Sequence, residues 1–397
     1  MTEQGWRRYE PVWSVRQVRR AFTGTLIART AQTMLPLTIL LLVRQRTGSF
    51  TEAGIAVAVS GLATVAGGPV TARLADRRGP HVLAVAAAVN AASLVLLAVT
   101  ASPAVSWIAV AAAGLSVPPL TAALRATITV GLTTERDRAA AFSLDAIATE
   151  LLFIAGPALV SAAAALGGTA DALFAASGLV VTGSALITRA AARTVRQPVP
   201  ATTIRRTGRY SRAGQAAILA PWLAIGSAQM AAIGFVEVAA TARVIHLGDS
   251  AAAGTVLAVW AVGSMTGGLI YGGRDWPGQA SGQLRVLLLL LAAGYAIVSM
   301  AGDLAALYPL MFVAGLACAP AVTALTTTFS AYANRTESFA WLASATSLGG
   351  SAGYAAGGYL VARDPITTAF LVGAALPVIA AAMVPRSRPS DRPFLPR

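Results

Sequence analysis

The sequence has very little of the chemistry from which most active sites are built. Among its 397 residues there is one cysteine, Cys318, and there are two histidines, His81 and His246; all 30 basic residues are arginine. A single cysteine excludes an intrachain disulfide, and with two separated histidines it does not make a metal site. Without lysine there is no phosphate-loop lysine and no Schiff base, which excludes an internal ATPase domain. We therefore expect no enzymatic activity, no metal and no cofactor.

Charge is also scarce, and long apolar runs take its place. Only 12% of the residues are charged and 56% are hydrophobic, whereas a soluble globular chain is about a quarter charged. A helix needs roughly 20 apolar residues to cross a bilayer core. Nine charge-free runs are long enough: 53–72, 82–101, 104–124, 151–170, 213–236, 251–273, 304–334, 338–362 and 365–385. Three shorter or interrupted runs bring the total to about twelve: 21–43, 172–188 and 286–302. A soluble helical protein would need amphipathic stripes and more charge, so we predict an all-α polytopic membrane protein.

The arginines predict the orientation of the chain in the membrane. With the N-terminus inside and the helices alternating, all but six of the 30 arginines fall in or beside cytoplasmic segments. The six exceptions are Arg44, Arg46, Arg243 and Arg363 near the outside, and Arg29 and Arg125 within the membrane. This bias predicts an inner (plasma) membrane protein with both termini in the cytoplasm. It also predicts contacts with anionic lipids, and it accounts for the net charge of +14 without nucleic-acid binding.

One segment differs from the short loops and divides the chain into similar halves. Residues 192–214 contain six arginines, two prolines and no acidic residue, which is typical of a cytoplasmic linker. We expect a six-helix bundle at 1–191 and a second, with a short cytoplasmic tail, at 215–397. Residues 113–127 (AGLSVPPLTAALRAT) resemble 314–328 (AGLACAPAVTALTTT), at an offset near 200. A duplication with an even number of helices in each half predicts parallel repeats about an axis along the membrane normal.

The loop 72–81 (ARLADRRGPH) carries a family resemblance. Leu74, Asp76, Arg77 and Gly79 match the signature of the major facilitator superfamily, whereas Ala72 and Pro80-His81 depart from it. The resemblance implies twelve transmembrane helices in two pseudo-symmetric bundles and transport by alternating access. It also implies that Asp76, Arg77 and Gly79 form a conformational latch between the halves. From the residues themselves we expect Gly79 to make a tight turn and Pro80 to lie in the first turn of the next helix.

Two glycine motifs lie within predicted spans. Gly156-Pro157 resembles part of the Gly-Pro signature of proton-driven antiporters in the superfamily, and a packing kink is the alternative interpretation. The stretch GGSAG at 349–353 satisfies a hydrolase nucleophile motif, but it lies inside a long charge-free helix. Gly349, Gly353 and Gly357 recur every four residues, which favours a face for close helix packing instead.

Ionisable groups inside the membrane are costly and usually face a cavity. The candidates for proton coupling or for lining the cavity are Arg29, Gln32, Arg125, Asp145, Glu150, Gln229 and Glu237. An interhelical brace between Arg125 and Asp145 is one expectation. Glu150 is the preferred coupling acid, although a permanent ion pair with Arg29 or Arg125 is an alternative. Arg29 and Glu237 could also extend towards an interface rather than face a cavity.

Together these features predict a secondary active transporter. We expect proton-coupled efflux of a small drug or metabolite, apolar or cationic, because acids are isolated in an otherwise apolar membrane region. The alternatives are proton-coupled uptake of a small nutrient and, more remotely, a membrane receptor or scaffold without transport. The expected partners are the small-molecule substrate, protons and membrane lipids. The sequence does not fix the oligomeric state, for which we expect a monomer.

Overall fold

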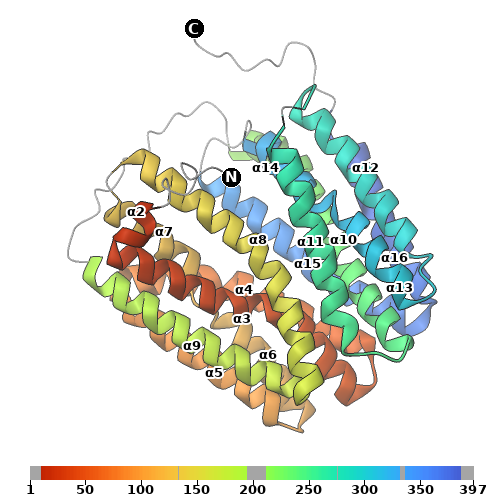
Figure 1. The fold of residues 1–397 in the computed structure, drawn as a ribbon, viewed down its shortest axis with the longest axis horizontal. Helices are drawn as coiled ribbons and strands as arrows, with labels where there is room; N and C mark the ends of the chain where they lie inside the picture. The colour runs from red at the N-terminus through yellow and green to blue at the C-terminus, as the bar shows by residue number, and fades with distance from the viewer. Residues whose placement is uncertain (1–9, 133, 195–211, 275, 331–335, 386–397) are drawn as a thin grey trace. The chain divides into compact units, whose positions relative to one another are not determined.

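The computed structural model describes residues 10–132, 134–194, 212–274, 276–330 and 336–385, and every regular element in these residues is a helix (Figure 1). Eleven of the spans are long and apolar enough to cross a membrane. The remaining long helix, α15 (Thr336–Arg363), is rich in Gly, Ser and Tyr, which lowers its hydropathy. Counted with α15, the described chain has the twelve helical spans that the charge-free runs predict.

The chain forms two compact units, the first made of Met1–Leu42 and Val59–Arg205. In this unit α5 packs against α6 and α9, and α7 and α8 also contact α9. Thr134 caps the N-terminus of α8, since its side chain accepts a hydrogen bond of 3.1 Å from the Asp137 amide. The helices that contribute to this unit are α2 (Glu10–Ser14), α3 (Arg16–Thr47), α4 (Phe50–Arg78), α5 (His81–Val99), α6 (Pro103–Leu115), α7 (Leu120–Gly131), α8 (Glu135–Leu166) and α9 (Thr169–Thr194).

The second unit consists of Val43–Ala58 and Arg206–Arg397, so it includes the hairpin tip where α3 ends and α4 begins. In this unit α10 packs against α15 and α16, and α12 packs against α13, α14 and α16. Trp222 and Phe329 are buried in its core. Its own helices are α10 (Arg212–His246), α11 (Ala252–Gly272), α12 (Ala280–Val298), α13 (Leu304–Gly315), α14 (Cys318–Ser330), α15 and α16 (Ile366–Met383).

Apart from the hairpin tip Val43–Ala58, the chain passes from the first unit to the second after Arg205, inside the segment expected to be a linker. Most of that segment, 195–211, lies outside the described residues, as do the N-terminal and C-terminal ends at 1–9 and 386–397. The assignment of 192–214 as a cytoplasmic linker therefore stays a prediction.

The same close helix contacts occur in both units, about 200 residues apart. Gly114 on α6 meets the carbonyl of Ser60 on α4 so closely that a Cβ would overlap it, and Gly315 on α13 meets the carbonyl of Trp260 on α11 in the same way. Two further contacts of the first unit have a counterpart in the second at this offset. The contact of Gly67 with Leu115 corresponds to that of Gly267 with Leu316. The contact of Gly156 with Thr33 corresponds to that of Gly353 with Ala231. The internal duplication predicted from sequence is thus present as equivalent backbone contacts.

Candidate functional site

The first unit contains a polar cluster that joins three helices around Arg29. The Arg29 guanidinium on α3 donates a hydrogen bond of 2.7 Å to Asp145 on α8, and the two side chains are each 11% exposed. It also donates to the hydroxyls of Thr149 (3.2 Å) and Thr121 (2.6 Å), the latter on α7. Because its charge is matched by Asp145 and two threonine hydroxyls accept further hydrogen bonds from it, Arg29 can be held inside an apolar unit.

The brace expected between Arg125 and Asp145 is wrong, because Asp145 pairs with Arg29. Arg125 is exposed and lies one helical turn after Thr121 on α7. The side chain of Thr121 reaches the cluster, whereas that of Arg125 stays at the surface of the structure. Sequence spacing placed the helix of Arg125 beside the cluster, but it did not identify the residue that makes the contact.

The acid preferred for coupling, Glu150, lies on α8, but its side chain is outside the described part of the structure. Its role as the coupling acid therefore stays a prediction. Gln32 is partly buried on α3, three residues after Arg29. The sequence interpretation missed Thr121 and Thr149 as partners of Arg29. Thr149 could have been predicted, because it lies one turn after Asp145 and their side chains therefore share a face of the helix.

Gly156 and Pro157 lie in the middle of α8, which continues through them. A Cβ at Gly156 would overlap the Thr33 side chain on α3, so glycine is needed for the close approach of the two helices. Proline lacks an N–H and leaves one carbonyl of the preceding turn without its helical donor. The close packing supports the interpretation of this motif as a packing element.

The second unit has a different polar pair at its centre. The Tyr354 hydroxyl on α15 donates a hydrogen bond to the Glu237 carboxylate on α10. Around this pair the two helices pack backbone to backbone, since a Cβ at Gly349 or Gly353 would overlap a carbonyl of α10. Gly357 also lies close to α10, because a Cβ added at this glycine would lie 3.2 Å from the Cα of Phe235. The packing face predicted from the glycine spacing is present.

Further polar groups are buried in the same unit. Gln229 on α10 and Tyr295 on α12 have no exposed surface. Within the described residues, neither the Gln229 amide nor the Tyr295 hydroxyl has a hydrogen-bond partner. Buried polar atoms of this kind are places where a water molecule or a ligand group can bind. Tyr295 and Tyr354 were missed by sequence reasoning because neither carries a charge that marks it.

The fourth span of each half is broken at an equivalent position. In the first unit α6 ends at Leu115 and α7 begins at Leu120, on either side of Pro118-Pro119. In the second unit α13 ends at Gly315 and α14 begins at Cys318, where the Ser264 hydroxyl accepts from the Ala319 amide. Interrupted helices at matching positions of two repeats are the best pointer to a substrate site in a transporter. Thr121, which contacts Arg29, lies in the first turn after one of these breaks.

The family loop has the tight glycine turn that its sequence predicts, since Gly79 has a φ of +94°, which favours glycine. Pro80, expected in the first turn of the next helix, lies directly before α5, which begins at His81. Arg77 is exposed, and the side chain of Asp76 lies outside the described part of the structure. The proposed latch between the two halves stays a prediction. An equivalent turn occurs before α12, where Gly278 has a φ of +88°.

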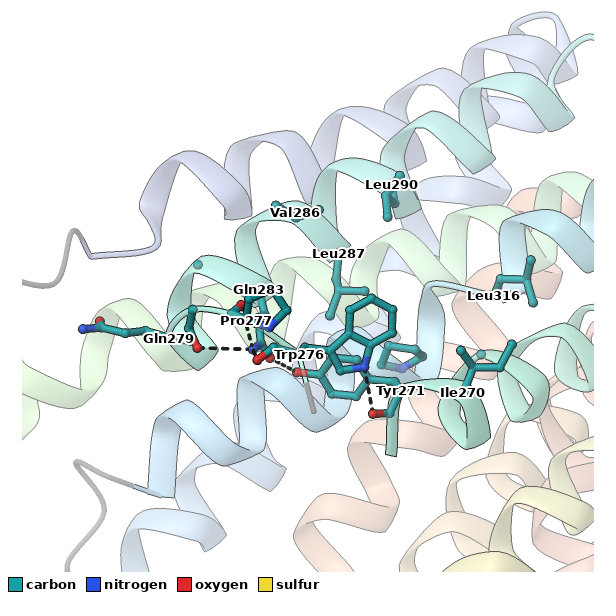
Figure 2. A pocket seen from close by; sticks show the side chains of 14 residues that line it. Ile270, Tyr271, Trp276, Pro277, Gln279, Gln283, Val286, Leu287, Leu290 and Leu316 are labelled. Carbon is teal, nitrogen blue, oxygen red and sulfur yellow. Dashed lines mark hydrogen bonds between the residues drawn. The ribbon is translucent and has the colours of Figure 1, made fainter. Parts of the chain in front are cut away.

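A hollow of about 410 Å³ lies beside this second turn. Figure 2 shows that Trp276 donates to the Tyr271 carbonyl (3.0 Å) and that Gln283 donates to the Trp276 carbonyl (3.1 Å). Beyond these groups the wall is apolar and includes Leu316 and Pro320 at the break between α13 and α14. The hollow therefore has one polar end and a long apolar side, and its exposed apolar residues suit contact with lipid.

Comparisons with known proteins agree with this architecture. Residues 21–279 match the family model of the Major Facilitator Superfamily. The fold is similar to that of the human organic anion transporter MFSD10 (TETRAN), with a TM-score of 0.65, 16% identity, and coverage of 93% of this chain and 99% of that one. No curated protein sequence matches the chain.

Two further solved structures share the fold. A mutant of the nucleoside transporter NupG gives a TM-score of 0.66 at 13% identity, with 92% of this chain and 98% of that one covered. The second is a bacterial homologue of the human lysosomal transporter Spinster, in an inward-facing and unoccupied conformation. It gives a TM-score of 0.64 at 16% identity, with 95% of this chain and 97% of that one covered.

Proposed function

Because the chain belongs to the Major Facilitator Superfamily of membrane transporters, we propose that it exports a small organic molecule in exchange for protons. The chain is a multi-pass membrane transporter and not an enzyme. Export by alternating access is the proposal, with both termini in the cytoplasm as the arginine distribution predicts. Each helical unit would move largely as a rigid body, and the substrate would bind near the broken fourth spans.

The observation that carries the proposal is the environment of Glu237. Asp145 is neutralised by Arg29, whereas Glu237 accepts a hydrogen bond from the neutral Tyr354 hydroxyl and forms no ion pair within the described residues. A proton carrier must exist with and without its proton during the cycle. The tyrosine hydroxyl can donate to a carboxylate or accept from a protonated acid, so this pair supports both states.

The polar pairs of the two units do not occupy equivalent positions. At the offset that relates the halves, Arg29 and Asp145 correspond to Ser227 and Leu342, and Glu237 corresponds to Ile39. The second unit therefore has no ion pair where the first has one, and the first has no acid where the second has Glu237. This asymmetry supports a division in which Arg29 and Asp145 organise one bundle and Glu237 carries the proton in the other.

The experiment is proton flux in proteoliposomes that contain a pH-sensitive dye. Ethidium, Nile red and uridine are added in turn as a cationic, an apolar and a nucleoside probe. Export predicts that at least one probe moves against the proton flow, and that Glu237→Gln stops this coupled movement. Tyr354→Phe should slow it. Glu52→Gln, which changes an exposed acid at the start of α4, is the matched control and should transport normally.

The variant Glu150→Gln is measured in parallel, because the sequence predicts Glu150 as the coupling acid. Persistent coupling in Glu237→Gln together with its loss in Glu150→Gln would assign the carrier to Glu150. Movement of probe and protons in the same direction would identify a symporter. A protein that moves neither protons nor any probe would fit a scaffold.

A further inference from the structure

A polar hollow of about 430 Å³ lies at one end of the second unit. It is lined by the end of α3, the start of α4, the last turn of α10, the end of α15 and the start of α16. Two basic side chains, Arg44 and His246, line it. His246 follows Glu237 by nine residues on α10, which places it about 14 Å further along the helix axis. The hollow is thus separate from the Glu237–Tyr354 pair.

Arg44 is held in place with hydrogen-bonding capacity that its surroundings do not use. Its guanidinium stacks over the Phe50 ring, with 4.9 Å from Cζ to the ring centroid. Its Nε is buried and has no hydrogen-bond partner among the residues that the structure describes. The Nε of Arg243 on α10 is also buried without a partner, but the terminal nitrogens of Arg243 donate to the carbonyls of Ala301 (2.6 Å) and Ser299 (3.4 Å). The fold thus engages the guanidinium end of Arg243, whereas the guanidinium of Arg44 lines the hollow.

The side-chain charges of the lining, rather than the helix dipoles, favour a negatively charged ligand. The first residues of two helices, Phe50 of α4 and Ile366 of α16, bring partial positive charge, but the last turns of α3, α10 and α15 bring partial negative charge. No acidic residue belongs to the described lining. Glu52 and Asp364, close to it in sequence, are exposed. The formal charge of the side chains that line the hollow is therefore positive, and Arg44 carries it.

Apart from Gly48 and Ser49, the remaining wall is hydrocarbon and aromatic. Phe50, Ile245, Val361 and Ile366 contribute apolar surface beside the two basic groups. The volume lies in the range of small-molecule sites. A guanidinium binds a carboxylate in a directed, charge-assisted geometry, and an imidazole can add a second N–H donor. We propose that this hollow binds a small organic anion, with its carboxylate against Arg44 and His246 and its apolar body against the hydrocarbon wall.

The test measures binding, so it is independent of transport and of the coupling proposal. The full-length protein in nanodiscs of neutral phospholipid is titrated with 4-fluorobenzoate, 4-fluorobenzamide and 4-fluorobenzylammonium, and fluorine NMR reports the bound fraction. These probes share one body and differ in charge. We expect the benzoate to bind most tightly of the three probes. Arg44→Gln should weaken benzoate binding about 10-fold or more, since hydrogen bonds to charged groups are worth about 1.5–3 kcal/mol. The same substitution should leave the affinity for 4-fluorobenzamide unchanged.

Arg46→Gln is the matched control, because Arg46 is a neighbouring arginine outside the hollow and its loss should change affinity less than about two-fold. His246→Gln provides a second variant on another helix and should also weaken benzoate binding. Equal binding of benzoate and benzamide, or equal effects of Arg44→Gln and Arg46→Gln, would overturn the proposal. Loss of benzoate binding when phosphatidylglycerol replaces a third of the lipid would assign the hollow to lipid phosphates and also overturn it.

Discussion

Removing Asp145 tests whether the Arg29 cluster holds the first unit together. In Asp145→Ala the Arg29 guanidinium keeps Thr121 and Thr149 but loses the one counter-charge that the described residues give it, in a site where it is 11% exposed. Breaking a buried ion pair from one side costs about 3–5 kcal/mol. The two threonine hydroxyls still solvate the cation, so we expect the lower end, about 3 kcal/mol. At roughly 2–4 °C per kcal/mol for a unit of 150–250 residues, the melting temperature should fall by about 6–12 °C.

The assay is thermal unfolding of the purified protein in detergent, followed by tryptophan fluorescence. Arg29→Met with Asp145→Leu removes both charges and should be less destabilising than the sum of the single changes, because neither charge is left alone. Arg125→Met is the control, since an exposed side chain outside the cluster should change stability by about 0.5 kcal/mol or less. Strict additivity of the two single changes, or a loss in Arg125→Met as large as in Asp145→Ala, would refute the assignment of the pair.

Two further predictions concern packing and topology. Gly353→Ala places a methyl group on the Ala231 carbonyl and should cost about 1–3 kcal/mol, whereas Gly350→Ala, whose added Cβ lies 3.9 Å from its neighbour, should be neutral or stabilising in the same melting assay. In intact cells, with Cys318 replaced by Ser, a cysteine introduced in 192–214 should resist an impermeant thiol reagent and one at Gly248 should react; labelling of the linker from outside would contradict the proposed topology.

Much of the fold could be predicted because the bilayer imposes its own thickness on the sequence. Each charge-free run corresponds to one or two helices in the described residues, and α15 was found although its glycines and serines make it only weakly apolar. The breaks in the fourth spans were not predicted, since 104–124 was interpreted as one helix. The Pro118-Pro119 pair was visible there. At 304–334 the break follows Gly315 and precedes Cys318, and the composition gives little sign of it.

The partners inside the site were harder to predict than the helices. In a water-soluble helix, polar and apolar faces show which side points inward, but a membrane helix is apolar towards lipid and towards its neighbours. Spacing along the chain therefore indicates the depth of Arg29, Arg125 and Asp145 but not the rotation of their helices. That is why Arg125 was assigned a contact that Arg29 makes. Tyr354 had no charge to mark it and emerged only with the three-dimensional contact to Glu237.

The contact between α10 and α15 has a mechanical consequence. The two backbones meet at three successive levels, at Gly349, Gly353 and Gly357, with no side chain between them at the two tightest points. Helices that touch in this way cannot slide or roll past each other without a backbone collision. The two helices therefore move as one rigid body. A displacement at the level of Glu237 and Tyr354 shifts both helices along their whole length. If Glu237 carries the proton as proposed, a change of protonation there would tilt α10 and α15 together, whereas side-chain packing alone would absorb the displacement locally.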